Sequence, residues 1–168
     1  MKYAPPGDQE VFYAHMLKHC RDEAETACVM LLWRTGMHAS TLCGRDWTFI
    51  GDYCHWQRTK TGKYLRAKVP AAEARVIFRC ERAGLLPTSA STLQRWVRRI
   101  GDRAGYAALR VSPNTFRHSR AVYLRDRGLK REEVAQVIGC SVAVLDKHYG
   151  QLSADELVSR VEKAERLV

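Results

Sequence analysis

Residues 111–121 read VSPNTFRHSRA, and they place Asn114, Arg117, His118 and Arg120 at the start of a helix expected over 115–127. Three further stretches combine glycine with polar or reactive side chains. They are TGMHASTLCG at 35–44, RTKTGK at 58–63 and VIGCS at 137–141, with Tyr149 nine residues after Cys140. These four stretches hold the residues from which a reactive site could be built, so the rest of the sequence is considered around them.

The composition indicates one basic globular domain over residues 1–168. Lys and Arg number 28 against 18 Asp and Glu, a formal net charge of +10, and 46% of the residues are hydrophobic. That hydrophobic content is enough for a core, which excludes general disorder. An excess of positive charge favours a polyanionic partner, most often nucleic acid, although a solvated basic surface without a partner is the alternative. Composition alone leaves DNA and RNA open.

Several classes of protein are not expected. The longest apolar run, 27–33, is far shorter than the roughly 20 residues that span a bilayer, so no membrane segment is expected. The six cysteines contain no CxxC pair and indicate reduced thiols in a cytoplasm. His15, His19 and Cys20 lack the tight spacing of a zinc site, so no metal is expected. No phosphate-binding glycine motif is present, and we expect no cofactor.

Hydrophobic periodicity predicts a mainly helical protein with a small three-stranded antiparallel sheet. The core is expected over 8–149, followed by a C-terminal helix within 150–168. The expected helices begin near Gln9 and cover 23–33, 39–43, 71–83, 92–103, 115–127, 130–138, 141–149 and 154–167. The expected strands are 47–50, 53–58 and 64–69, joined by turns at 51–52 and 60–63. Ser91 is the expected N-cap of the helix over 92–103.

The helix over 92–103 is expected to bind DNA. Its apolar stripe leaves four arginines pointing largely elsewhere: Arg95, Arg98, Arg99 and Arg103. Such a surface could lie against phosphates and reach base edges in a major groove. The alternative is a solvated face with Asp102 as a partial counter-ion.

In order and spacing, the four stretches resemble the catalytic domain of the tyrosine recombinases, the phage-integrase and Xer-like family, from about Gln9 to the C-terminus. The resemblance implies that Tyr149 attacks a phosphate of double-stranded DNA to give a phosphotyrosyl link. It implies that Lys60 protonates the departing 5′ oxygen and that Arg117 binds the phosphate through two donors. His118 fits the family pattern. Cationic side chains then do the work of a metal ion.

The same resemblance extends to the DNA contacts and to the place where the protein works. Lys63 on the hairpin and Arg120 beyond the Arg-His pair are expected to join the DNA-binding surface. A protein of this kind is expected in the cytoplasm, associated with the nucleoid.

Three positions depart from the family pattern. His38 stands where the first arginine belongs, Asn114 where a histidine belongs, and Cys140 where a histidine or tryptophan belongs. A neutral histidine lacks the two-pronged guanidinium, asparagine cannot shuttle a proton, and a thiol is a weak donor. Arg34, one helical turn before His38, could supply a guanidinium, although a surface or helix-capping arginine is the more common role.

These departures leave two hypotheses for the function. In the first, the protein cleaves and rejoins DNA through Tyr149 with a weakened site. In the second, it is a catalytically inactive recombinase-derived protein that binds DNA in a regulatory or architectural role.

The ends of the chain raise a second question. Family members commonly carry an N-terminal helical domain that closes a clamp on the duplex, and no segment of that length precedes Gln9. We therefore expect that the chain is a fragment, or that its affinity for DNA comes from oligomerisation or from its basic surface alone. After a capping box at 153–156, an apolar stripe follows in the expected C-terminal helix: Leu157, Val158, Val161, Ala164 and Leu167. This helix could pack within its own chain or dock on a neighbouring protomer as a homo-oligomer contact.

Overall fold

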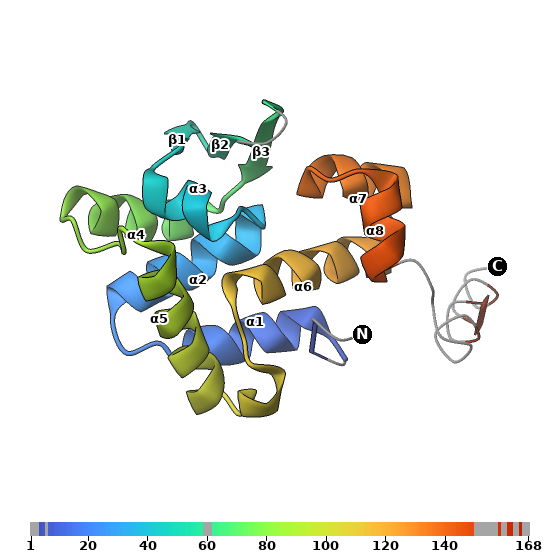
Figure 1. Cartoon of the computed structure of the whole chain (residues 1–168), viewed down its shortest axis with the longest axis horizontal. Helices are drawn as coiled ribbons and strands as arrows, with labels where there is room; N and C mark the ends of the chain where they lie inside the picture. Colours follow the sequence, from blue (N-terminus) through green and yellow to red (C-terminus); the bar gives the residue numbers. More distant parts are fainter. Residues whose placement is uncertain are drawn as a thin grey trace.

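The computed structural model describes residues 4–5, 7–58 and 62–149, with 158, 161, 162 and 165 beyond them, and only the backbone of Tyr149. Its helices are α1 (Gln9–Lys18), α2 (Glu23–Thr35), α3 (Ala39–Gly44), α4 (Ala71–Arg82), α5 (Ala90–Arg103), α6 (Pro113–Asp126), α7 (Arg131–Ile138) and α8 (Val142–Tyr149). The strands are β1 (Trp47–Ile50), β2 (Tyr53–Gln57) and β3 (Tyr64–Lys68), and a short 3-10 turn covers Ala107–Leu109. The predicted fold class, mainly helical with one small antiparallel sheet, is confirmed (Figure 1).

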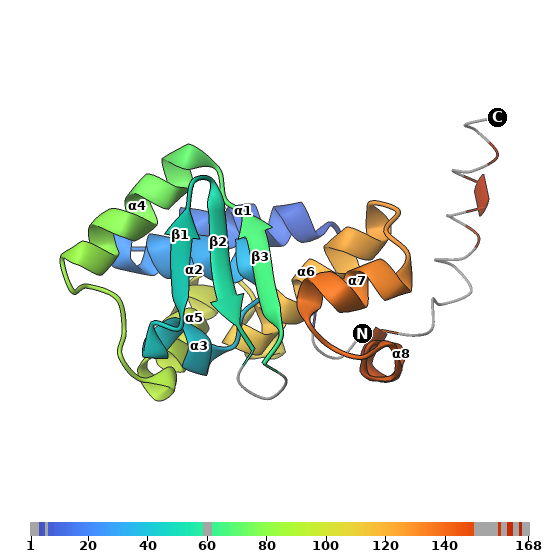
Figure 2. The same ribbon diagram turned by 90° about the horizontal axis from the view of Figure 1, so that it is seen from above.

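The sheet has strand order β1-β2-β3, with both pairs antiparallel. Cys54 and Trp56 of β2 are buried while Tyr53 and Gln57 are exposed, which is the alternation expected of a sheet covered on one face. Figure 2 shows the three strands lying across α2, with β3 nearest to α6 and α7. The hairpin between β2 and β3 therefore ends close to the start of α6.

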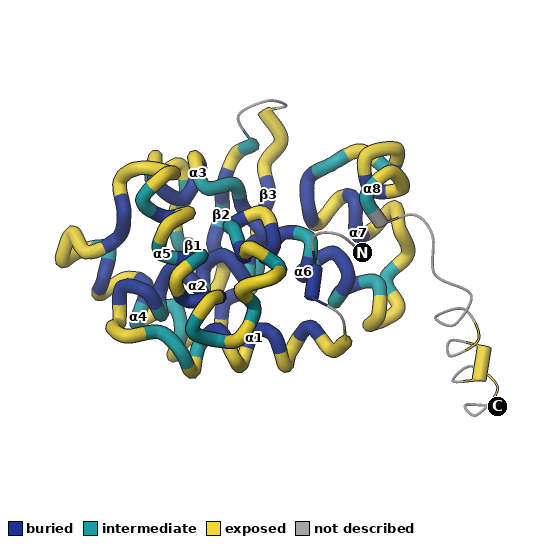
Figure 3. The backbone as a smooth tube through the Cα atoms, turned by 60° about the horizontal axis from the view of Figure 1, so that its bottom comes forward, coloured by how far each residue is buried: buried dark blue, intermediate teal, exposed yellow. Residues whose placement is uncertain are grey.

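The main core lies between α1, α2, α4, α5, the first turn of α6 and the sheet, and it is rich in aromatic rings. Tyr13 stacks on Trp33 with ring centroids 4.9 Å apart, and Phe12 packs on Phe116 at 5.3 Å. A smaller cluster joins the end of α6 to α7 and α8 through Leu124, Ile138 and Leu145 among others. Figure 3 shows buried residues, in dark blue, inside both groups of helices.

Capping explains where the helices begin and corrects two expectations. Ser112 and Thr115 exchange hydrogen bonds at the start of α6, and Pro113 occupies its first turn, so α6 begins two residues earlier than predicted. The cap of α5 is Ser89, whose hydroxyl accepts from the Thr92 amide at 3.2 Å, rather than Ser91.

The prediction of a helix over 154–167 falls mainly outside the described residues. The four described there are helical, and of the expected apolar stripe they include Val158 and Val161, both exposed. Within the described ranges, no helix combines the length and apolar character needed to cross a membrane.

Candidate functional site

A cavity of about 440 Å³ lies where the end of β2 meets α6 and the α7–α8 junction. It gathers side chains from all four stretches that the sequence singled out, with Arg58 as the first residue of the hairpin stretch. The lining residues are His38, Arg58, Ser112, Asn114, Thr115, Arg117, His118, Ile138, Cys140, Val144 and His148. None of these described lining residues carries a carboxylate, so the cavity is suited to an anion.

Helix α6 contributes Asn114, Arg117 and His118 to one wall of the cavity. Their spacing of three and four residues places them on one face of the helix. The N-terminus of α6 also faces this cavity through Ser112 and Thr115, so the positive end of the helix dipole adds to the charge of Arg117.

The Thr-Gly pair at the end of α2 positions Arg117. Gly36 adopts a left-handed conformation (φ +62°) that ends α2, a conformation that glycine takes without steric cost. A Cβ at Gly36 would lie 3.8 Å from the Cα of Arg117, so the two segments pass closely. The turn exposes the Gly36 carbonyl, which accepts a hydrogen bond from Nη1 of Arg117 at 3.0 Å. One side of the guanidinium is thereby fixed.

Arg117 is a buried cation, with only 8% of its surface exposed. Burial, followed by the nearby positive charge of Arg58, lowers the pKa of Arg117 to about 10. The guanidinium thus remains charged at neutral pH, yet it lies where its charge is poorly solvated. A bound anion would relieve that cost.

His118 is held in its neutral form. Burial, then the nearby positive charges of His148 and Arg117, lower the pKa of His118 to about 4. The rings of His118 and His148 lie 5.8 Å apart, which brings α6 and α8 together at the cavity. At pH 7 His118 can therefore donate one ring N–H and accept at the other nitrogen.

The α7–α8 junction reaches the sheet through Gly139. This residue ends α7 in a left-handed conformation (φ +76°), and a Cβ there would lie 2.5 Å from Cδ1 of Leu65 on β3. Only glycine fits this approach, and the residue that follows, Cys140, consequently lines the cavity. Tyr149 is the last residue of α8, directly after the cavity residue His148, and its side chain lies outside the described part of the structure.

Two lysines were expected on the hairpin. Lys60 lies outside the described residues, so its role stays a prediction. Lys63 is exposed, and its carbonyl accepts from the Arg58 amide at 2.9 Å. This bond holds the two sides of the hairpin together beside the cavity.

Arg34 is occupied elsewhere and does not fill the place left by His38. Its guanidinium makes two hydrogen bonds to Glu73 on α4, at 2.8 and 2.9 Å, and it lies over the ring of Tyr13. His38 itself begins α3 and lines the cavity.

The arginines expected to contact DNA fall into two groups. Arg95 and Arg99 are exposed on α5 and Arg98 is half-buried, so these three can present their charge to a partner. Figure 2 shows α3, α5, the end of β2, the beginning of β3 and α8 towards one edge of the molecule.

The other two arginines are engaged within the fold. Arg103 donates to Glu25 at 2.5 Å and to the His19 carbonyl at 3.0 Å. Arg120 lies over the rings of Trp33 and Tyr123 and does not line the cavity. We do not retain these two among the proposed DNA contacts.

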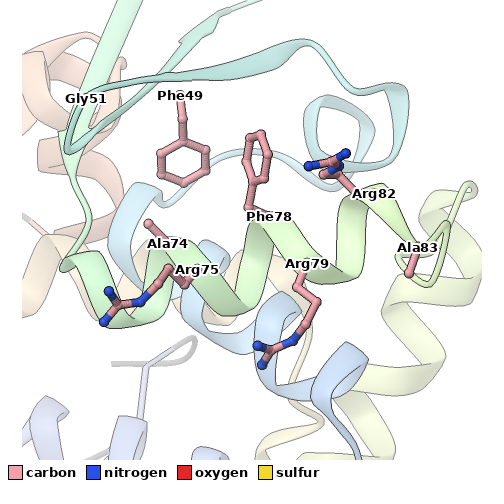
Figure 4. Close-up of a pocket in the computed structure, with 8 residues that line it drawn as sticks. All are labelled: Phe49, Gly51, Ala74, Arg75, Phe78, Arg79, Arg82 and Ala83. Carbon is pink, nitrogen blue, oxygen red and sulfur yellow. The ribbon is translucent and has the colours of Figure 1, made fainter.

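A second cavity, of about 770 Å³, lies between the β1–β2 turn and α4 (Figure 4). Phe49 and Phe78 lie side by side there, and the lining includes Arg75, Arg79 and Arg82 of α4. It contains no nucleophile or acid among its lining residues. Across the described part of the chain, no group of three or more His, Cys, Asp or Glu side chains is placed to hold a metal ion.

Sequence reasoning missed four polar residues of the site, Arg58, Ser112, Thr115 and His148, and a signal existed for Arg58 and His148. Because Cys54 and Trp56 of β2 face inward, the period of two places Arg58 on the same side. His148 lies three residues after the buried Leu145, on the inward face of α8.

The fold that carries this cavity is that of the tyrosine-recombinase catalytic domain. Among solved structures, XerA recombinase matches with a TM-score of 0.76 and 19% identity over 96% of this chain and 64% of that one. XerH recombinase bound to its difH substrate matches with a TM-score of 0.69 and 16% identity, over 96% and 54% of the two chains. The integrase of transposon Tn1549, in complex with transposon right-end DNA, matches with a TM-score of 0.60 and 14% identity, over 95% and 64%.

A curated relative carries the same family name. Tyrosine recombinase XerC of Corynebacterium efficiens is 24% identical over 172 aligned positions, which cover 83% of this chain and 50% of the relative. The chain thus spans about half the length of the curated relative that it matches. No protein-family model matches the chain.

Proposed function

We propose that this chain binds double-stranded DNA and cleaves and rejoins one strand through a phosphotyrosyl intermediate at Tyr149. The observation that carries the proposal is the cavity itself, in which Arg117 faces an anion-sized space without a carboxylate, beside the helix that ends in Tyr149. The similarity to XerH bound to difH and to the Tn1549 integrase bound to transposon DNA supports duplex DNA as the partner.

The proposed reaction needs no external energy source. The phenol of Tyr149 loses its proton to solvent and its oxygen attacks the phosphorus, the bond to the 5′ oxygen breaks, and Lys60 gives that oxygen a proton. Arg117 stabilises the negative charge that grows on the nonbridging oxygens, while neutral His118 donates one hydrogen bond. In the reverse step the 5′ hydroxyl attacks the phosphotyrosine, which restores the DNA strand and the free phenol.

Three substitutions weaken this site relative to the family pattern. His38, Asn114 and Cys140 each replace a stronger donor, and loss of one preorganised donor costs about 3 kcal/mol of transition-state stabilisation. This observation favours a second candidate function, in which the protein binds DNA and does not cleave it. The two candidates differ in one measurable product, a covalent protein–DNA adduct.

The test uses nicked suicide duplexes of varied sequence, which trap the covalent intermediate because the cleaved end diffuses away. The proposal predicts an adduct that survives denaturation and that is absent in Tyr149→Phe. Tyr64→Phe, at an exposed position of β3, is the matched control and should leave the adduct unchanged. DNA binding without any adduct in the wild-type protein would favour the second candidate.

A further inference from the structure

Arg58 occupies a position that the proposed function has not used. It follows β2 directly, and its backbone closes the hairpin by donating to Lys63 and accepting from Gly62 at 2.8 Å. Its side chain lines the cavity that contains Arg117. The Nε atom of Arg58 is buried and has no hydrogen-bond partner among the described residues.

The two guanidinium groups face the cavity from different elements, Arg58 from the sheet and Arg117 from α6. They are close enough for the charge of Arg58 to contribute to the lowered pKa of Arg117. Like charges in one partly buried space repel each other, and no carboxylate among the described lining residues offsets them. An anion that contacts both groups would convert this repulsion into attraction.

A phosphodiester has the chemistry that such a pair recognises. It carries one negative charge shared by two nonbridging oxygens, and a guanidinium donates in a planar fork that matches those oxygens. Arg117 already uses one Nη1 donor on the Gly36 carbonyl, which leaves its remaining donors for one side of a phosphate. The unpartnered Nε–H of Arg58 provides a further donor from the hairpin.

We propose that Arg58 is a second phosphate-binding guanidinium of this site and acts together with Arg117 on the scissile DNA phosphate. The inference rests on the proposed function above and deepens it. His38 stands where the family pattern has an arginine, and Arg58 of the hairpin supplies the cation that is missing at that position. Arg34 cannot do so, because Glu73 holds its guanidinium.

The first experiment measures binding of inorganic phosphate to the full chain by isothermal titration calorimetry. Arg58→Gln should bind phosphate about 10- to 100-fold more weakly, as expected for the loss of a charge-assisted hydrogen bond. Arg58→Lys keeps the charge and loses the fork, so its affinity should fall between the two. Arg75→Gln removes the same charge from the exposed side of α4 and should bind phosphate like the wild type.

The second experiment is a rescue in the suicide-duplex assay. Arg58→Gln should reduce the rate of adduct formation about 100-fold or more, by analogy with other lost transition-state donors. Adding His38→Arg to Arg58→Gln should restore much of that rate, because a guanidinium returns to the cavity from the other side. A purely structural role for Arg58 would give no such rescue. Circular dichroism and urea unfolding confirm that each variant is folded.

The outcomes separate this inference from the proposed function. Equal phosphate affinity in the wild type and Arg58→Gln, or no phosphate binding by the wild type, overturns the role of Arg58 even if the wild type cleaves DNA. Equal adduct formation in the wild type and Arg58→Gln overturns it as well. Loss of phosphate affinity in Arg58→Gln, in a protein that never forms an adduct, retains the phosphate site and removes only the cleavage activity.

Discussion

Replacing Gly139 with alanine should destabilise the protein and weaken the site at the same time. At φ +76° an alanine pays about 1 kcal/mol for the left-handed conformation. Its Cβ would also lie 2.5 Å from Cδ1 of Leu65, a side chain that is only 9% exposed and so has little room to move. Overpacking of this kind costs about 1–3 kcal/mol. The expected loss in the free energy of unfolding is therefore about 2–4 kcal/mol.

Gly84→Ala provides the matched control for this variant. Gly84 has a similar backbone angle (φ +68°), and an added Cβ would meet nothing within 4 Å. Its cost should be the conformational part alone, about 1 kcal/mol. The difference between the two variants in urea unfolding gives the packing contribution to the lost free energy of unfolding. Calorimetry with inorganic phosphate should show weaker binding in Gly139→Ala alone, because Cys140 moves with its neighbour. Equal destabilisation by the two substitutions would refute the close approach of the α7–α8 junction to β3.

Two further predictions concern charge. Arg99→Gln should reduce the slope of log affinity for duplex DNA against log salt by about one, because one phosphate contact is lost. Arg103→Gln should leave that slope unchanged and lower the stability of the protein, since Arg103 is paired with Glu25. DNA titrations at several salt concentrations test the slope for both variants. Burial lowers the pKa of His118 to about 4 from 6.5, so the unfolded chain binds a proton first and stability should fall as the pH drops from about 6.5 towards 4. Solvent screening limits this loss to about 1–2 kcal/mol, and urea unfolding across that pH range should show a flatter profile in His118→Gln.

The sequence predicted the elements whose signals are local. Turn residues and alternation placed the three strands, and the helix expected over 130–138 ends where α7 ends. The start of α6 was placed too late because the proline was not used as a first-turn residue. Such signals act within a few residues, so they can be read without tertiary contacts.

Long-range partners could not be predicted in the same way. Nothing local shows that Arg34 pairs with Glu73, 39 residues away, or that Arg103 pairs with Glu25, 78 residues away. The same limit applied to the site: the motifs identified Arg117 and His118, whereas the bond from Arg117 to the Gly36 carbonyl depends on packing of α2 against α6. Arg58 was missed as well, although strand alternation alone would have placed it on the inward side.

The most direct test of the account identifies the amino acid that becomes attached to DNA. The wild-type protein is incubated with nicked suicide duplexes, digested with nuclease and trypsin, and examined by mass spectrometry for a peptide that carries a nucleotide. The account predicts the nucleotide on Tyr149 and its loss in Arg117→Gln. A nucleotide on any other residue would contradict it.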